Sequence, residues 1–271
     1  MAKSFGSRFR IEPRQRARLG QRDSGDLAAF PDRKAAETQS AKDVAAIDEL
    51  QDRLYAEHKR ALLVVLQGMD TSGKDGTIRH VFKEVGPLGV SVTAFRRPSE
   101  EELAHDFLWR AHIAAPRRGT IGIFNRSHYE DVLIGRVRKL APKLEIEARY
   151  DHINAFEKIL SDSGTMVLKF MLHISRKVQG ERLQDRLDKP ESRWKFNPDD
   201  LEDRKLWARY MAAYEWMLDR CSTAWAPWHV IPSDHKWARN AAIAAIVRET
   251  LELMNPRYPK PDWDPKKFVV K

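Results

Sequence analysis

The chain has 271 residues and a formal net charge of +9, and 42% of its residues are hydrophobic. This length fits one large α/β domain or one domain with an inserted lid, and the apolar content excludes global disorder. The single Cys221 excludes a disulfide framework and an all-cysteine zinc site, and no run approaches the roughly 20 apolar residues of a membrane helix. We therefore expect a cytoplasmic protein, and the excess charge points to an anionic partner: nucleic acid, a membrane surface or a phosphate-rich small molecule.

Residues 1–36 are polar and are interrupted by glycine and proline, which predicts an extended arm. Between Met1 and Arg22, seven basic residues stand against Glu12 alone. Mitochondrial presequences share this composition, but Pro13 would interrupt the amphipathic helix that they need. We favour a basic arm that lies near an anion-binding site, followed by a single domain over residues 37–271.

Beyond the arm, short apolar runs alternate with patterns of helical spacing. The runs typical of buried strands are 61–66, 90–95, 120–124, 166–174 and 229–231. The segments with helical character are 40–59, 75–85, 99–114, 143–161, 175–188 and 235–254. Strands that alternate with helices predict right-handed βαβ units, and hence an α/β fold with a mainly parallel sheet sandwiched by helices.

The sharpest motif follows the first predicted strand. Gly68-Met-Asp-Thr-Ser-Gly-Lys74 matches the G-x-x-x-x-G-K pattern of a phosphate-binding loop, between a strand and a helix as that motif requires. Glycines let the backbone wrap around phosphate oxygens, and the helix N-terminus adds a positive end. We predict that Gly68, Ser72 and Gly73 cradle phosphate and that Lys74 reaches its terminal groups.

The loop departs from the ordinary pattern at two acids. Asp75 stands where a Ser or Thr normally contacts Mg²⁺, and Asp70 lies inside the loop. A carboxylate inside an anion cradle is unfavourable unless a cation or a proton neutralises it. Asp70 is therefore a candidate Mg²⁺ ligand or a group that positions the acceptor; the alternative is that it only stabilises the turn.

The third predicted strand ends in Asn125-Arg-Ser-His-Tyr-Glu-Asp131. Ligands of such folds bind at the carboxyl edge of the sheet, so we expect Arg126 to contact phosphate and Glu130 or Asp131 to help hold metal. His128 is interpreted as a surface residue of a polar turn rather than as a base.

The long segment of about residues 176–220, before the last strand, is predicted to be a helical lid, because long insertions in compact domains usually serve function. Arg182, Arg186 and Lys189 share one helical face, whereas Asp185 and Asp188 are expected off that face. Arg193 and Lys195 flank Trp194 just beyond. We interpret these cations as a clamp for phosphate; a solvated charged face and a simple cover for the sheet edge are the alternatives.

Together, the phosphate-binding loop, the Phe124-Asn-Arg-Ser-x-Tyr129 strand end and the Arg182…Arg186…Pro190…Trp194-Lys195 segment resemble the family-2 polyphosphate kinases. The resemblance runs from about Phe9 to Pro256. It implies a P-loop kinase core with a helical lid inserted before the last strand, Mg²⁺ dependence with Mn²⁺ as a substitute, and a basic channel for inorganic polyphosphate. By position, the family's catalytic residues correspond to Asp70, Lys74, Arg126 and Arg186.

One departure from the family concerns the acceptor. Much of the family reads Phe-Asp-Arg-Ser-Trp-Tyr-Asn at the third strand, with Asp at the position of Asn125 and Asn at the position of Glu130. In this chain the amide and the carboxylate have therefore changed places. This puts a metal role for position 125 in doubt and favours Asp70 and Glu130 as the metal ligands. The variant resembles the subgroup that phosphorylates both AMP and ADP, which predicts AMP, ADP and ATP as nucleotide partners.

Two other functions are compatible with parts of this pattern. An ATP-dependent nucleoside monophosphate kinase shares the core and the lid, and donor preference would separate it. A basic nucleic-acid-binding protein would explain the charge but not Asp70 inside the cradle, and the sequence has no clear stacking platform for single strands. We therefore expect no nucleic-acid or membrane partner, and we expect a homo-oligomer.

Overall fold

The computed structural model describes residues 4–264, 267–268 and 270. Its centre is a five-stranded parallel sheet in the order β2-β3-β1-β4-β5. The strands are β1 (Ala61–Gln67), β2 (Val90–Ala94), β3 (Ile121–Asn125), β4 (Thr165–His173) and β5 (Trp228–Pro232). All seven residues of the central strand β1 are buried, as the continuous apolar run predicts. The predicted α/β fold with a parallel sheet is confirmed.

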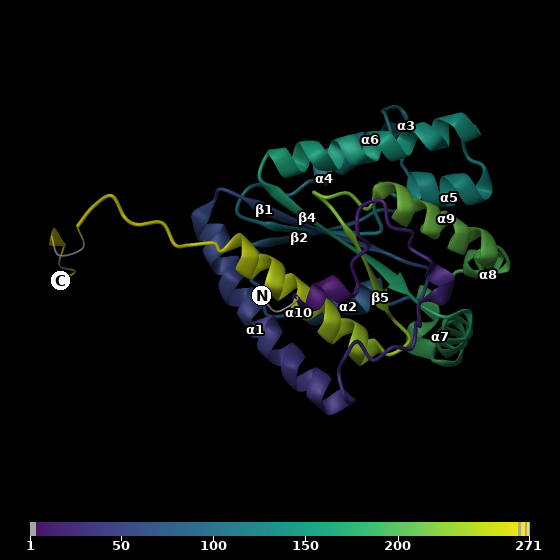
Figure 1. Ribbon diagram of the computed structural model, residues 1–271, viewed down its shortest axis with the longest axis horizontal. Helices are drawn as coiled ribbons and strands as arrows, with labels where there is room; N and C mark the ends of the chain where they lie inside the picture. The colour runs from purple at the N-terminus through teal and green to yellow at the C-terminus, as the bar shows by residue number, and fades with distance from the viewer. Residues whose placement is uncertain (1–3, 265–266, 269, 271) are drawn as a thin grey trace.

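Helices cover both faces of the sheet (Figure 1). The long helices are α1 (Arg33–Glu57), α6 (Lys143–Asp162), α7 (Arg176–Asp188), α9 (Trp207–Cys221) and α10 (Lys236–Met254). The shorter ones are α2 (Lys74–Val81), α3 (Glu100–Leu103), α4 (Trp109–Ala114), α5 (Glu130–Arg138) and α8 (Asp199–Lys205), with 3-10 turns η1 (Phe5–Arg8), η2 (Leu19–Gln21) and η3 (Pro190–Lys195). Among the described residues, no helix has both the length and the apolar character that a membrane crossing requires.

Alternate residues of β1 supply two separate cores. Leu63 and Val65 pack with residues of α5, α6 and α9, whereas Leu62 and Val64 pack with residues of α1 and α10 on the opposite face. This division follows from the two-residue period of a strand. Because helices bury both faces, the ends of the strands are the part of the sheet that is open to a ligand.

The structure differs from the predicted elements at the helix 99–114, in the lid and at α5, where no helix was predicted. The predicted helix 99–114 is two short helices, and between them the Asp106 carboxylate accepts a hydrogen bond of 2.9 Å from the Leu108 amide, which favours a turn over a continuous helix. The predicted lid 176–220 divides: α9 buries residues such as Met217 and Leu218 in the core, whereas α7, η3 and α8 lie at the mouth of the strand ends.

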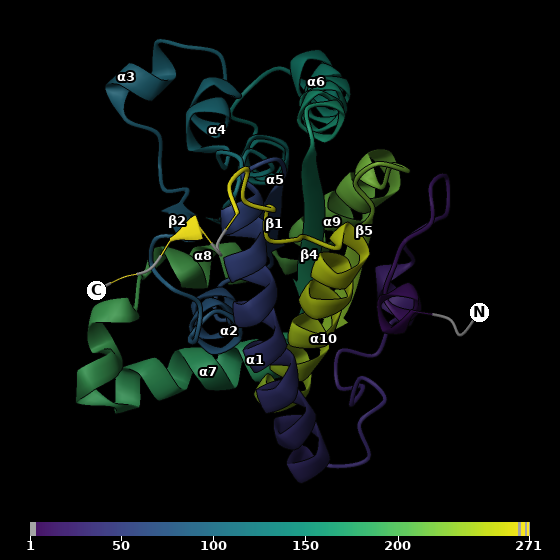
Figure 2. The same ribbon diagram turned by 90° about the vertical axis from the view of Figure 1, so that its left-hand side faces the viewer.

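The N-terminal arm packs along the free edge of β5 (Figure 2). The Ile11 amide donates to the Trp228 carbonyl at 2.8 Å, and the Val230 amide donates to the Phe9 carbonyl at 2.9 Å. Phe9, Ile11 and Leu19 are at most 4% exposed. The arm is therefore a fixed part of the domain, and its described basic residues do not line the main cavity. Its predicted role beside an anion site stays a prediction, and Lys3 lies outside the described residues.

Candidate active site

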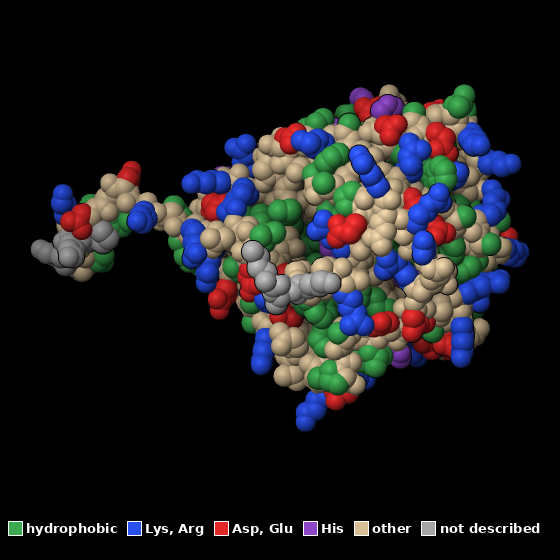
Figure 3. Space-filling view, viewed as in Figure 1, with side chains coloured by type: hydrophobic (Ala, Val, Ile, Leu, Met, Phe, Trp, Pro, Cys, Tyr) green, Lys and Arg blue, Asp and Glu red, His purple; other side chains and the backbone are tan. Residues whose placement is uncertain are grey.

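A cavity of about 540 Å³ opens at the carboxyl ends of β1, β2 and β3 and is bounded by α7, η3 and α10. Three carboxylates line it: Asp70, Asp75 and Asp185. Nine cationic side chains line it: Lys74, Arg96, Arg126, Arg182, Arg186, Lys189, Lys195, Lys236 and Arg239. This excess of positive charge indicates a ligand with several negative charges. Blue Lys and Arg side chains also gather on the surface over α7, α8 and α9 (Figure 3).

Two glycines shape the phosphate-binding loop for steric reasons. Gly73 has φ 107° and begins α2, and a Cβ there would lie 1.9 Å from a guanidinium nitrogen of Arg239. Gly68 has φ 152°, and its Cβ would lie 2.8 Å from the Leu172 carbonyl oxygen. Both positions therefore require glycine.

Lys74 is only 8% exposed, and its ammonium donates to the carbonyl oxygens of Gly68 at 2.8 Å and Met69 at 3.3 Å. Burial, with a further contribution from Arg126, lowers the pKa of Lys74 to about 8. The lysine is thus folded against the carbonyl oxygens of its own loop.

Two buried arginines support the loop from behind. Arg182 donates to the carbonyl oxygens of Thr71 and Ser72 at 2.9 and 3.3 Å, and to those of Ser233 and Asp234, both at 2.8 Å. Arg239 donates to the Ser72 carbonyl at 2.8 Å, and burial lowers its pKa. Arg239 and Lys236 were not predicted as site residues, although a buried-looking arginine in the first turn of the Ala- and Ile-rich α10 was an available signal.

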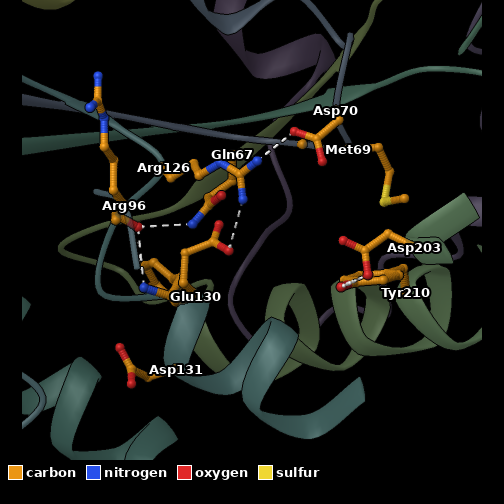
Figure 4. Close-up of polar contacts among 12 residues, drawn as sticks. Gln67, Met69, Asp70, Arg96, Arg126, Glu130, Asp131, Asp203 and Tyr210 are labelled. Carbon is orange, nitrogen blue, oxygen red and sulfur yellow. Dashed lines mark hydrogen bonds and ion pairs between the residues drawn. The ribbon is translucent and has the colours of Figure 1, made fainter. Parts of the chain in front are cut away.

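Asp70, Arg126 and Glu130 form one cluster (Figure 4). Arg126 forms an ion pair with Asp70 and a second one of 3.4 Å with Glu130, so the two predicted metal ligands flank this arginine. Burial on its own would raise the pKa of Asp70, but Arg126, Lys74 and Arg186 lower it below the usual value. Arg126 has a left-handed backbone with φ 58°, which is costly for a residue other than glycine. Such strain is typical of functional positions.

Asn125 donates a hydrogen bond of 2.6 Å to the Asp75 carboxylate. Asp75, which departs from the usual phosphate-binding loop, and Asn125, which departs from the usual family sequence, are therefore in direct contact. An aspartate at position 125 would place two carboxylates at this distance, which favours a cation between them. With the amide of Asn125 in this place, no cation is needed between positions 75 and 125.

The lid residues divide into those that reach the cavity and those that do not. Arg186, Lys189 and Lys195 line it, together with Asp185, so the prediction that Asp185 lies off this face is wrong. Asp185 pairs with Lys189 at 3.7 Å, the one-turn separation of a helix. Arg193 is exposed and donates to the Leu187 carbonyl, away from the cavity.

Arg186 is held by the lid itself. It donates to the Lys195 carbonyl at 2.9 Å and pairs with Asp200 at 3.4 Å. Burial, and next the nearby Asp70 carboxylate, raise the pKa of Asp200 to about 6. The sequence analysis missed Asp200, because nothing in the pattern of α8 separates it from the exposed Asp199 beside it.

Two predicted positions lie beneath the cavity wall rather than on it. Ser72 is fully buried, and its carbonyl, not its hydroxyl, engages the supporting arginines. The interpretation of His128 as a surface residue is wrong: it is 0% exposed and packs against Phe156 and Tyr129.

The donor set fits a hard divalent cation that is held partly by substrate. Mg²⁺ prefers carboxylate oxygens and is commonly bound by one or two of them together with substrate phosphates. Asp70 and Asp75 line the cavity beside the phosphate-binding loop, and Glu130 lies behind Arg126. Within the described part of the chain, no group of three or more His, Cys, Asp or Glu side chains forms a self-sufficient metal cage.

Comparison with known proteins identifies several relatives. The profile of the family described as polyphosphate kinase 2 matches residues 31–259. An AMP/ADP-polyphosphate phosphotransferase of Meiothermus ruber is 49% identical over 264 residues, which are 97% of this chain and 99% of that protein. An ADP-polyphosphate phosphotransferase of Rhodopseudomonas palustris is 41% identical, over 80% of this chain and 79% of that protein.

The fold has a close counterpart among solved structures. The crystal structure of polyphosphate kinase 2 from Arthrobacter aurescens TC1 superposes with a TM-score of 0.94 at 39% identity. The superposition covers 98% of this chain and 95% of that one.

Proposed function

Since this chain belongs to the polyphosphate kinase 2 family, we propose that its cavity transfers phosphate between inorganic polyphosphate and AMP or ADP, forming ADP or ATP. The observation that carries the proposal is the set of nine cations and three carboxylates around a phosphate-binding loop. Polyphosphate and a nucleotide each bring several negative charges, and the chief task of the site is to hold both together.

The cavity has two sides that suit the two substrates. On the side of β4 and β5, Arg182, Lys236 and the lid cations form a lining with many positive charges, which suits a polyphosphate chain. On the side of β2 and β3, Phe95, Arg96 and Asn125 form a lining with an aromatic ring and a single cation at the strand ends. We assign this second side to the acceptor nucleotide, and Lys74 and Arg126 to the place where the two meet.

Transfer breaks the bond from the terminal phosphorus to its bridging oxygen and forms a bond to an oxygen of the acceptor phosphate. The acceptor oxygen is already ionised, so the site needs no general base. Lys74 and Arg126 neutralise the charge of the transferred group, and Arg186 closes over it from the lid. Arg186 already lines the cavity in this structure, while its Nη1 donates to the Lys195 carbonyl and pairs with Asp200.

The family requires a divalent metal, and we propose Mg²⁺ at Asp70, with Mn²⁺ able to replace it. When bound, the ion neutralises phosphate oxygens as a Lewis acid. Asp70 would hold the ion together with the substrate phosphates, which would leave Arg126, its ion-pair partner in this structure, available to the transferred group.

The direct test is to incubate the pure protein with polyphosphate, Mg²⁺ and either AMP or ADP, and to separate the nucleotide products. We expect ADP and ATP from AMP, and ATP from ADP. Transfer from ATP to AMP at equal or higher rate without polyphosphate would favour a nucleoside monophosphate kinase. Lys74→Ala is the matched control, and near-normal turnover in a folded Lys74→Ala protein would contradict the role of the loop.

Acceptor range gives a prediction of its own. The double variant Asn125→Asp with Glu130→Asn moves a carboxylate next to Asp75, shifts the metal and removes one partner of Arg126. We expect the ratio of AMP to ADP rates to change by about tenfold, about 1.4 kcal/mol in relative transition-state binding. The measurement is the initial rate with each acceptor separately. An unchanged ratio with persisting activity would show that both positions only shape the turn.

A further inference from the structure

A buried polar network lies directly behind the loop that carries Arg126. Lys169 of β4 and Glu157 of α6 are both 0% exposed, and their Nζ and Oε2 atoms are 2.6 Å apart. The Lys169 ammonium also donates to the Tyr129 hydroxyl and to the Cys221 carbonyl, both at 2.8 Å. The Tyr129 hydroxyl in turn donates to Glu157 Oε1 at 2.8 Å.

The charge states in this network are set by its surroundings. Burial raises the pKa of Tyr129, so its hydroxyl keeps its proton and donates. Burial alone would raise the pKa of Glu157, but the nearby Lys169 ammonium makes the net shift downward, so Glu157 is a carboxylate. Burial lowers the pKa of His128, so its ring, 3.5 Å from Glu157, is neutral. The network is thus one ion pair with a phenol bridging it.

A buried ion pair is a costly way to fill a core. Desolvation of the two charges commonly exceeds their attraction, and apolar side chains of the same volume often give equal or greater stability. The surroundings here are suited to such a replacement, because Trp228 and Phe156 pack around the network. The ion pair and Tyr129 form directional hydrogen bonds, which apolar side chains in the same place could not form.

Tyr129 connects this network to the loop that carries Arg126. The Tyr129 amide donates to the Ser127 hydroxyl oxygen at 3.2 Å, and the Gln67 side chain donates to the same oxygen at 3.1 Å. Gln67 directly precedes the phosphate-binding loop. The Arg126 amide donates to the Leu66 carbonyl at 3.0 Å. Arg126, with its strained φ of 58°, is therefore held between β1 on one side and the anchored Tyr129 on the other.

We propose that Tyr129, Glu157 and Lys169 are positioning residues that fix the conformation of the loop from Arg126 to Glu130 and thereby align Arg126 on the transferred phosphate. None of the three lines the cavity, so they act through Arg126. The proposal rests on the proposed transfer activity for its kinetic part, and its structural part stands without that activity.

The test is Tyr129→Phe, which removes one hydroxyl and leaves the Lys169–Glu157 pair intact. Tyr150→Phe is the matched control: Tyr150 is also 0% exposed, and its hydroxyl donates at 3.4 Å to the carbonyl of Val132 in α5, outside the loop from Arg126 to Glu130. We expect Tyr129→Phe to lower kcat about tenfold at unchanged KM for polyphosphate, since small misplacements of catalytic groups are costly. Tyr150→Phe should change kcat less than twofold.

A double-mutant cycle separates positioning from general stability. In an Arg126→Lys background, Tyr129→Phe should lower kcat less than twofold, because the group that it aligns is gone. An equal tenfold loss in both backgrounds, or an equal loss for Tyr150→Phe, overturns the proposal. The double variant Glu157→Gln with Lys169→Met removes both charges of the buried pair and is a second test. A normal kcat in this protein also overturns the proposal.

Hydrogen exchange gives a readout that needs no turnover. Tyr129→Phe should speed exchange of the amides from Arg126 to Glu130 relative to those of β4, and Tyr150→Phe should not. Unchanged exchange in Tyr129→Phe refutes the positioning role. A wild-type protein that transfers no phosphate but shows this exchange pattern would refute the proposed function alone.

Discussion

Lys74 is a buried cation that is bound to backbone carbonyl oxygens. It is only 8% exposed, and its hydrogen bonds go to carbonyl oxygens of its own loop. Burial, more than the repulsion from Arg126, lowers its pKa to about 8. A phosphate that binds beside it supplies the missing negative charge and raises that pKa again.

Binding of tripolyphosphate should therefore depend on pH near 8. The folded-state pKa is depressed, so the charged ammonium is lost as pH rises through 8, and we expect affinity to fall severalfold between pH 7 and pH 9. Binding should also take up protons at pH 8, which calorimetry in buffers of different ionisation enthalpy measures. Lys74→Met is the control and should lose most of this dependence. Equal affinity at pH 7 and pH 9 would contradict the assignment.

Arg186 should matter for its planar fork as well as for its charge. In this structure a single guanidinium nitrogen, Nη1, donates to both the Lys195 carbonyl and Asp200. A phosphate-stabilising arginine supplies roughly 10³–10⁵ in rate, and lysine cannot reproduce its bidentate geometry. We expect Arg186→Lys to lower kcat by at least about 10²-fold. Steady-state kinetics distinguishes a role in the transition state from a role in substrate binding. A change confined to KM for polyphosphate would make Arg186 a binding residue.

At the scale of elements, the Arg186–Asp200 contact joins α7 to α8 and holds the lid in the conformation seen here. The raised pKa of Asp200, about 6, means that the folded state favours its protonated form. This carboxyl therefore destabilises the fold as pH rises through about 4 to 6, and the loss is complete above pH 6.

Asp200→Asn should consequently stabilise the protein at pH 8, by about 1–3 kcal/mol. The gain should shrink at pH 5, where much of the wild-type carboxyl is already protonated. Thermal unfolding at both pH values measures the difference, and Asp199→Asn, an exposed neighbour, is the control. A Tm for Asp200→Asn below that of the wild type at pH 8 would mean that the ion pair with Arg186 outweighs the burial of the charge.

Strong local patterns predicted most of the elements correctly. The apolar runs at 61–66 and 166–174 correspond to β1 and β4, and the glycine loop lies between β1 and α2 as expected. α5 was missed, because the polar strand end at Arg126 and Glu130 hides the start of a helix. The arm was predicted from its glycines and prolines, but its buried contacts with β5 depend on residues more than 200 positions away, and no local pattern contains them.

The site was predictable where chemistry follows a motif, as at Lys74 and Arg126. It was not predictable where burial decides a role. Arg239 supports the loop, and Asp200 holds the lid arginine, only because α10 and α8 bring them there. His128 was misjudged for the same reason: a polar neighbourhood in sequence is fully buried in space.

For the whole molecule, the arm contributes to stability through its apolar side chains. Ile11 is 0% exposed and lies beside β5. Truncating a buried isoleucine costs about 2–5 kcal/mol, so we expect Ile11→Ala to lower Tm by several degrees. Arg14→Ala, at an exposed position of the same arm, should leave Tm within about a degree. Equal Tm values for the two variants would show that the arm does not contribute to the stability of the domain.

The pairing of the arm with β5 also determines when the arm can form its native contacts during synthesis. Ile11 is made before its partner Trp228, which follows more than 200 residues later. At roughly 5–20 residues per second, the arm waits on the order of ten to forty seconds for its strand. Throughout that interval Phe9 and Ile11 lack their partners on β5, so we expect their apolar side chains to be accessible to the chaperones that bind nascent chains.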